Sequence, residues 1–147
     1  MSSTNLYVGL MSGTSLDGID AVLVEINGTL VDDFSWNQVA FITNAYDREF
    51  RDNLYRGIEL GTPELLCQLN VSLGEQFANT VCDLCELAGV SPAQLKAIGS
   101  HGQTFWHIPP SHEFHGSTLQ LGDPATLAEQ TGVTVISDFR SRDMALG

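Results

Sequence analysis

A short polar segment, residues 12–20, carries the residue types that bind phosphate groups. It reads SGTSLDGID and lies between two apolar runs. Its two glycines let backbone N–H groups turn toward a common point, and Thr14 and Ser15 add hydroxyl donors. Asp17 and Asp20 offer carboxylates for Mg²⁺, which proteins usually bind partly through water. Together these parts predict a phosphate clamp.

The same residues also fit a plainer structure. The segment contains no GxxxxGK[ST] and joins one predicted strand to the next, so it is not a P-loop. Ser, Gly and Asp are ordinary turn residues, and a decorated hairpin turn accounts for them equally well. On these residues alone both alternatives stay open.

The histidines form a second group of candidates. His101 lies between two glycines in GSHGQT, residues 99–104, where a ligand can approach the backbone closely. The alternative is a histidine ring that is satisfied by the backbone of its own loop. His107, His112 and His115 fall in a proline-containing stretch, and no Asp or Cys shares their spacing. This favours a surface loop over a metal site.

Charged residues near the end of the chain form a third group. Asp138 and Arg140 are expected at the end of the last strand, where α/β sheets place ligand-binding groups. Arg140 or Arg142 could bind a substrate carboxylate in a bidentate fork. An ion pair with Asp138 or Asp143 explains the arginines equally well.

Composition limits the classes of partner. The chain has 147 residues, 43% of them hydrophobic, which suits one domain with a real core. Its 18 acidic and 6 basic residues give a net charge of −12, which disfavours nucleic acid and anionic membranes as partners. No apolar stretch has the length of a membrane span, and no signal-peptide pattern begins the sequence. The three cysteines lack a second CxxC and are expected to be core thiols in a reducing cytoplasm.

Hydrophobic periodicity predicts the elements that position these residues. The expected strands are 6–11, 19–26, 34–43, 96–104, 117–123 and 133–139, and the expected helices are 47–60, 62–88 and 124–130. The fourth strand is expected to run into a polar loop, and Asn27-Gly28 is a hairpin signal. Hairpins followed by strand–helix–strand crossovers predict a mixed α/β sheet, with parallel strands on one side of the first strand.

Three segments resemble one family in particular. GLMSGTSLDGIDAVLV near the N-terminus, AIGSHGQT at 97–104 and DFRSRDMALG at 138–147 are similar, in order, to segments of anhydro-N-acetylmuramic acid kinases. The resemblance implies the ribonuclease H-like fold of sugar kinases, heat-shock ATPases and actin, with strand–helix order β-β-β-α-β-α-β. Such proteins have two lobes with ATP between them. Residues 1–147 would be the N-terminal lobe, ending before the second lobe.

The resemblance also implies roles for particular residues. The ATP-phosphate loop would comprise Gly13, Thr14, Ser15, Leu16, Asp17, Gly18, Ile19 and Asp20. The sugar pocket would include Ser100, His101, Gln103, Thr104, Asp138 and Arg140. Superfamily relatives often carry an Asp where this chain has Met11, so the carboxylate near Mg²⁺ would be Asp17, Asp20 or a residue of the other lobe.

The implied reaction is ATP-dependent phosphorylation of 1,6-anhydro-N-acetylmuramic acid at O6 with hydrolytic opening of the anhydro ring. The products would be N-acetylmuramic acid 6-phosphate and ADP, in cytoplasmic recycling of bacterial cell wall by a homodimer. The catalytic Asp is expected beyond residue 147, so the isolated chain should bind ATP weakly and turn over nothing. Two alternatives are an ATPase-fold protein without a sugar substrate and a non-catalytic α/β binding module.

Overall fold

One mixed β-sheet forms the centre of the computed structural model, which describes residues 5–28, 33–113 and 115–146. Five strands lie in the order β3-β2-β1-β4-β5, and β6 pairs with β4. Their bounds are β1 Leu6–Ser12, β2 Gly18–Asn27, β3 Ser35–Ala45, β4 Leu95–Ile108, β5 Ser117–Leu121 and β6 Val135–Ile136. The α/β class predicted from the sequence is confirmed.

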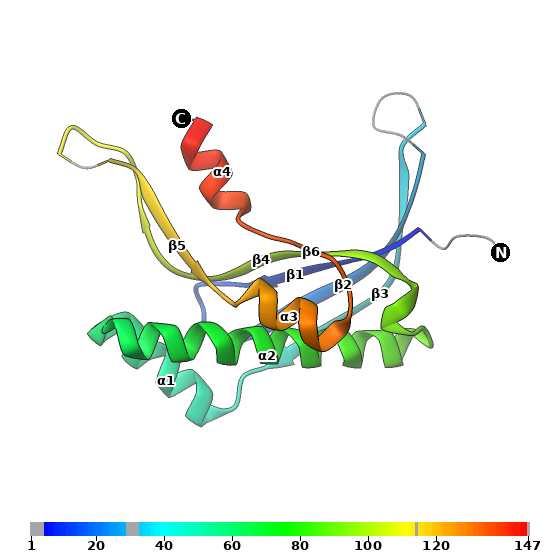
Figure 1. The fold of residues 1–147 in the computed structure, drawn as a ribbon, viewed down its shortest axis with the longest axis horizontal. Helices are drawn as coiled ribbons and strands as arrows, with labels where there is room; N and C mark the ends of the chain where they lie inside the picture. The colour runs from blue at the N-terminus through cyan, green and yellow to red at the C-terminus, as the bar shows by residue number, and fades with distance from the viewer. Residues whose placement is uncertain (1–4, 29–32, 114, 147) are drawn as a thin grey trace.

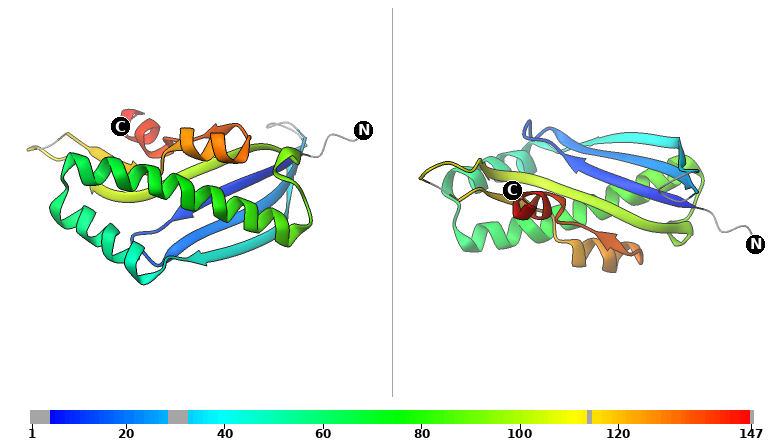
Figure 2. Two further views of the ribbon diagram at one scale, coloured as in Figure 1. Left: turned by 60° about the horizontal axis from the view of Figure 1, so that its bottom comes forward. Right: turned by 90° about the horizontal axis from the view of Figure 1, so that it is seen from above.

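The helices are distributed unequally over the two faces of this sheet. They are α1 Arg48–Leu60, α2 Pro63–Ala88, α3 Pro124–Thr131 and α4 Phe139–Leu146, with a short 3₁₀ helix, η1, at Pro92–Gln94. α1, α2 and α3 lie on one side of the sheet, and α4 stands on the other (Figures 1 and 2). Within the described ranges, no helix combines the length and apolar character needed to span a bilayer.

The long helix α2 forms where the sequence predicts it. Thr62 caps its start by accepting a hydrogen bond from the Leu65 N–H, and Pro63 occupies the first turn. Gly89 ends the helix in the left-handed conformation. One apolar stripe of α2 is buried against the sheet and α1; it contains Leu69, Leu73, Phe77, Val81 and Leu84.

Strand pairing around β1 decides which polar segments meet. β1 pairs antiparallel with β2 and parallel with β4, as predicted. In the parallel register Leu10 lies beside Ser100, and Ser12 lies beside Gln103. The polar loop after β1 is therefore adjacent to the middle of β4, although about 90 residues separate them in the sequence.

Two predicted strand boundaries are wrong. β4 does not leave the sheet after Thr104 but continues to Ile108, because its second half pairs with β5. Gly102, with φ of +75°, provides the local change of direction. The last strand stops at Ile136 instead of residue 139, because Asp138 adopts a left-handed φ of 63° and Phe139 begins α4.

The cysteine prediction holds for one residue of three. Cys85 is buried in the core, and burial raises the pKa of its thiol. Cys67 and Cys82 are exposed on the outer surface of α2, because their positions fall outside its buried stripe.

Asp123 couples the stability of α3 to pH. Its carboxylate accepts hydrogen bonds from the Thr126 hydroxyl and backbone N–H, which lower its pKa. We expect Asp123→Ala to reduce the free energy of unfolding by about 1 kcal/mol at neutral pH. Because the pKa of Asp123 is lower in the folded than in the unfolded protein, its carboxylate stabilises the fold at pH values above the unfolded-state pKa. The difference in unfolding free energy between Asp123→Ala and wild type should therefore shrink as pH falls below about 4.

Urea unfolding at pH 7 and at pH 3 measures both effects. Asp123→Asn is the matched control, since an amide oxygen caps a helix equally well but does not titrate. A difference between Asp123→Ala and wild type that stays constant with pH contradicts this interpretation.

Candidate functional site

The polar loop between β1 and β2 is anchored from below by one apolar side chain. Leu16 has a left-handed φ of 54°, and its side chain is buried in a cluster with Leu54, Leu73 and Phe105. Its backbone N–H donates to Gly13 O at 3.3 Å. Leu16 thus stabilises the loop from the protein interior, and as a fully buried residue it lines none of the cavities described below. Ile19 is likewise a core residue, on β2.

The exposed side of the loop opens into a cavity of about 350 Å³. Gly13 and Thr14 line it from the loop, His101 and Thr104 from β4, and Arg140 from α4. Tertiary structure thus brings part of the predicted phosphate loop and part of the predicted sugar-binding set into one cavity. This shared cavity is the candidate site.

Besides Met11 and Ser12 at the end of β1, sequence reasoning missed three residues of the cavity that lie on β4 and β5. His107 lies on β4, in the part of the strand expected to be a loop, and Thr118 and Gln120 lie on β5. The alternation of STLQL places Thr118 and Gln120 on one face of β5, and this signal could have identified them. His112 and His115 lie in the connection between β4 and β5, outside the cavity.

Arg140 and His101 contact each other within this cavity. The Arg140 Nε–H donates to His101 Nε2 at 3.3 Å, and His101 Nδ1 lies 3.2 Å from Gly102 O. An Nε2 that accepts requires the neutral tautomer with its proton on Nδ1, which then donates to Gly102 O. Among the described residues, no acidic side chain forms an ion pair with Arg140 or Arg142. The guanidinium terminus of Arg140 therefore stays available to an anionic ligand.

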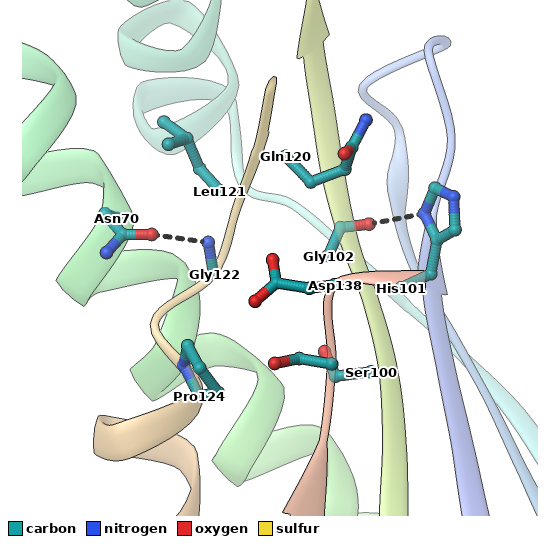
Figure 3. Close-up of a pocket in the computed structure, with 10 residues that line it drawn as sticks. Asn70, Ser100, His101, Gly102, Gln120, Leu121, Gly122, Pro124 and Asp138 are labelled. Carbon is teal, nitrogen blue, oxygen red and sulfur yellow. Dashed lines mark hydrogen bonds between the residues drawn. The ribbon is translucent and has the colours of Figure 1, made fainter. Parts of the chain in front are cut away.

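A smaller cavity of about 50 Å³ adjoins the first, because His101 and Gln120 line both (Figure 3). Its wall includes Ser100, whose buried Oγ has no hydrogen-bond partner among the described residues. The Asp138 carboxylate points into this space from its left-handed backbone position (Figure 3). A buried hydroxyl without a partner is costly, so this cavity suits a small polar group or water.

Gln103 lies beneath the loop and lines neither of these cavities. Its side chain has no exposed surface. Its Oε1 accepts from the Ser12 hydroxyl at 2.5 Å, and its Nε2 donates to Gly13 O at 2.9 Å and Thr104 O at 3.2 Å. The resemblance implies a sugar contact for Gln103, whereas in the structure this amide is fully used by protein groups.

The two predicted Mg²⁺ ligands have different surroundings. Asp17 is exposed on the loop and accepts from the Ser15 hydroxyl at 2.7 Å. Asp20 accepts from the Thr43 hydroxyl at 2.6 Å and lines a hollow of about 430 Å³ that shares Met11 and His101 with the main cavity. The Asp20 carboxylate therefore lies beside the candidate site, whereas Asp17 belongs to the same loop but lines none of these cavities.

These donors fit a magnesium ion that is bound mostly by phosphate and water. Nowhere in the described ranges do three or more His, Cys, Asp or Glu side chains gather as a metal cage. Mg²⁺ typically takes only one or two protein carboxylates and fills its remaining positions with substrate phosphates and water. A single carboxylate from Asp17 or Asp20 is sufficient for that mode of binding.

Taken together, the mixed sheet, the three helices on one face and the polar loop beside β4 match one lobe of the sugar kinase and ATPase type. The profile of the family described as anhydro-N-acetylmuramic acid kinase matches residues 5–147. The chain belongs to this family.

Individual relatives agree with this assignment. The anhydro-N-acetylmuramic acid kinase of Caldanaerobacter subterraneus subsp. tengcongensis is 44% identical over 148 residues, which cover 97% of this chain and 37% of the relative. The protein of the same name from Bacillus cereus strain Q1 is 46% identical, over 97% of this chain and 38% of its own length. The protein of the same name from Clostridioides difficile strain 630 is 46% identical, over 95% of this chain and 37% of its own length. The chain thus spans a little over a third of these relatives.

The buried position of Leu16 yields a test of the loop's anchor. Leu16→Ala keeps the left-handed backbone but leaves a cavity in the cluster, and we expect it to lower the free energy of unfolding by about 2–5 kcal/mol. Thr14→Ala, at an exposed loop position, should change it by less than about 0.5 kcal/mol. Urea unfolding followed by circular dichroism compares the two, and equal effects would show that Leu16 does not anchor the loop.

Proposed function

We propose that residues 1–147 are the N-terminal lobe of a kinase that phosphorylates 1,6-anhydro-N-acetylmuramic acid at O6 with ATP. The observation that supports this most strongly is the shared cavity. The loop residues Gly13 and Thr14 line it together with His101, Thr104 and Arg140. A phosphate donor and a polar acceptor can therefore meet at one place.

On the phosphate side, binding must come from local groups. The net charge of −12 opposes an anion over the molecule as a whole, so backbone N–H groups and the Thr14 hydroxyl supply the attraction, since the Ser15 hydroxyl donates to Asp17. Asp17 or Asp20 would hold Mg²⁺ through one carboxylate oxygen or an intervening water. When bound, the metal ion neutralises charge on the transferred phosphoryl group.

On the acceptor side, the polar groups suit an amino sugar with a carboxylate. The Arg140 guanidinium fits the lactyl carboxylate of a muramic sugar in a bidentate arrangement. Ser100, Thr104 and Asp138 offer hydrogen bonds to ring hydroxyls or to the acetamido group, while His101 lies beside the sugar and holds the Arg140 guanidinium through its ring nitrogen. These contacts orient the sugar toward the loop.

The proposed reaction forms two bonds and breaks two, and it also moves one proton. A water oxygen bonds to the anomeric carbon as the bond from that carbon to O6 breaks, and O6 bonds to the γ-phosphorus as ADP leaves. A general base takes the proton of the water; we place it beyond residue 147. The products are N-acetylmuramic acid 6-phosphate and ADP. We further propose that the complete protein is a homodimer that works in the cytoplasm, where ATP is available, in the recycling of peptidoglycan.

Ligand-dependent stability of the complete polypeptide tests the function. We expect MgATP to raise its melting temperature, by an amount equivalent to about 2.7 kcal/mol at a hundredfold excess over Kd. The anhydro sugar should stimulate ADP release, and its product should be heavier by one phosphoryl group (HPO3) and one water. Stabilisation by MgATP without any effect of the sugar would indicate an ATPase that lacks a sugar substrate. No effect of MgATP would indicate a binding module.

Substitution of the loop aspartates separates their roles. In the complete polypeptide, Asp17→Asn should lower kcat/KM for ATP by about 10–100-fold, because a metal-associated carboxylate is lost, and added Mg²⁺ should partly restore it. Asp20→Asn tests whether the Asp20 carboxylate also contributes to Mg²⁺ binding, by the same measurement of kcat/KM for ATP. Glu86→Gln, exposed on α2, makes the same change in net charge and is the control. Unchanged kinetics in both aspartate variants would exclude them as ligands.

A further inference from the structure

A buried hydrogen-bond network lies directly beneath the polar loop and joins three elements. Ser12 ends β1, Gln103 lies in β4, and Tyr46 lies between β3 and α1. From these contacts we infer that Gln103 is a positioning residue: it orients the Gly13–Thr14 peptide so that the Thr14 N–H points into the cavity as a donor to an anionic group. The inference rests on the proposed function, because the anion is taken to be the terminal phosphate of ATP.

The orientation follows from where the Gly13 carbonyl points. It accepts from Gln103 Nε2 at 2.9 Å and from the Leu16 N–H at 3.3 Å, so its oxygen faces the protein interior. In a trans peptide the N–H of the next residue points opposite to the carbonyl. The Thr14 N–H is therefore directed outward, and both Gly13 and Thr14 line the 350 Å³ cavity. Among the described residues, no group accepts a hydrogen bond from the Thr14 N–H.

The other end of the loop is held in the same manner. The Tyr46 N–H donates to Asp17 O at 3.0 Å, and the Ser12 hydroxyl lies 2.7 Å from Gly18 O. The Tyr46 hydroxyl lies 2.8 Å from the same Ser12 oxygen. Burial raises the pKa of Tyr46, so its hydroxyl keeps its proton. The carbonyls of Gly13, Asp17 and Gly18 are thus turned inward, away from the exposed side of the loop.

Burying a primary amide is expensive unless every donor and acceptor is paired. Gln103 meets this condition only because its two donors and its acceptor bond to Gly13, Thr104 and Ser12. An apolar side chain of equal length would fill the same space without orienting the loop. A purely structural role and a positioning role therefore predict different behaviour for such a substitution.

Gln103→Met in the complete polypeptide makes this distinction. It keeps the length of the side chain and removes the amide that makes three hydrogen bonds, to Ser12, Gly13 and Thr104. We expect kcat/KM for ATP to fall by about 10–100-fold, since a hydrogen bond to a charged group is lost, while KM for the sugar stays at the wild-type value. In ¹H–¹⁵N spectra, the Thr14 amide signal should move on addition of ATP in the wild type and stay in place in the variant.

Gln103→Glu gives a second, independent measurement. A protonated carboxyl at this buried position can donate to Gly13 O, whereas the ionised form cannot and repels that carbonyl. Relative to wild type at each pH, kcat/KM for ATP should be close to normal near pH 5.5 and should fall toward the Gln103→Met value near pH 8. The titratable groups around this position are Tyr46, Asp17 and His101; they are present in both proteins, so the ratio cancels their own titration.

Val133→Ala is the control for lost stability. Val133 is buried in the main core, between α3 and β6 and away from the loop. It should lower the melting temperature without changing kcat/KM for ATP. The inference is overturned if Gln103→Met retains the wild-type kcat/KM for ATP, or if Val133→Ala lowers kcat/KM for ATP as much as Gln103→Met does. It is also overturned if kcat/KM of Gln103→Glu, relative to wild type, does not depend on pH.

Two further outcomes are also decisive. If Gln103→Met does not fold, the pH profile of Gln103→Glu decides the question by itself. A wild-type protein that does not respond to ATP overturns the proposed function and this inference together, whereas a responsive wild type with unaffected variants overturns the inference alone.

Discussion

Parallel pairing between β1 and β4 is the constraint on which the candidate site depends. It places Ser12 beside Gln103 and thereby joins the loop after β1 to the middle of a strand far along the chain. Parallel strands need a crossover connection, and α1 with α2 supplies it while burying one face of the sheet. The core and the site therefore form from the same strand arrangement.

A second feature is the division of the loop into an apolar side and a polar side. Leu16 fills the cluster below, and the carbonyls of Gly13 and Asp17 accept hydrogen bonds from the Gln103 side chain and the Tyr46 N–H. The protein as a whole repels anions, with a net charge of −12. An anion can bind only where oriented N–H dipoles outweigh this field at short range, and the anchored loop provides such a place.

Much of the framework could be predicted from the sequence. The stripe of α2, the caps at Thr62 and Asp123 and the pairing on both sides of β1 follow from local patterns, and the structure confirms them. The stripe and the caps are predictable because periodicity and capping depend on near neighbours in the chain, and the pairing because the order of hairpins and crossovers restricts how strands can pair. The end of the last strand could not be predicted this way, since the left-handed backbone of Asp138 is not encoded by any apolar pattern.

The sequence by itself determined most of the elements, the family and the chemistry of the polar segments, but it did not predict helix α4. It did not determine which side chains face a ligand. Gln103 and His101 are two residues apart in one polar motif, yet only His101 reaches the cavity. The tertiary structure decided this, because the placement of a side chain on a strand depends on which neighbouring strand and loop it meets across the sheet.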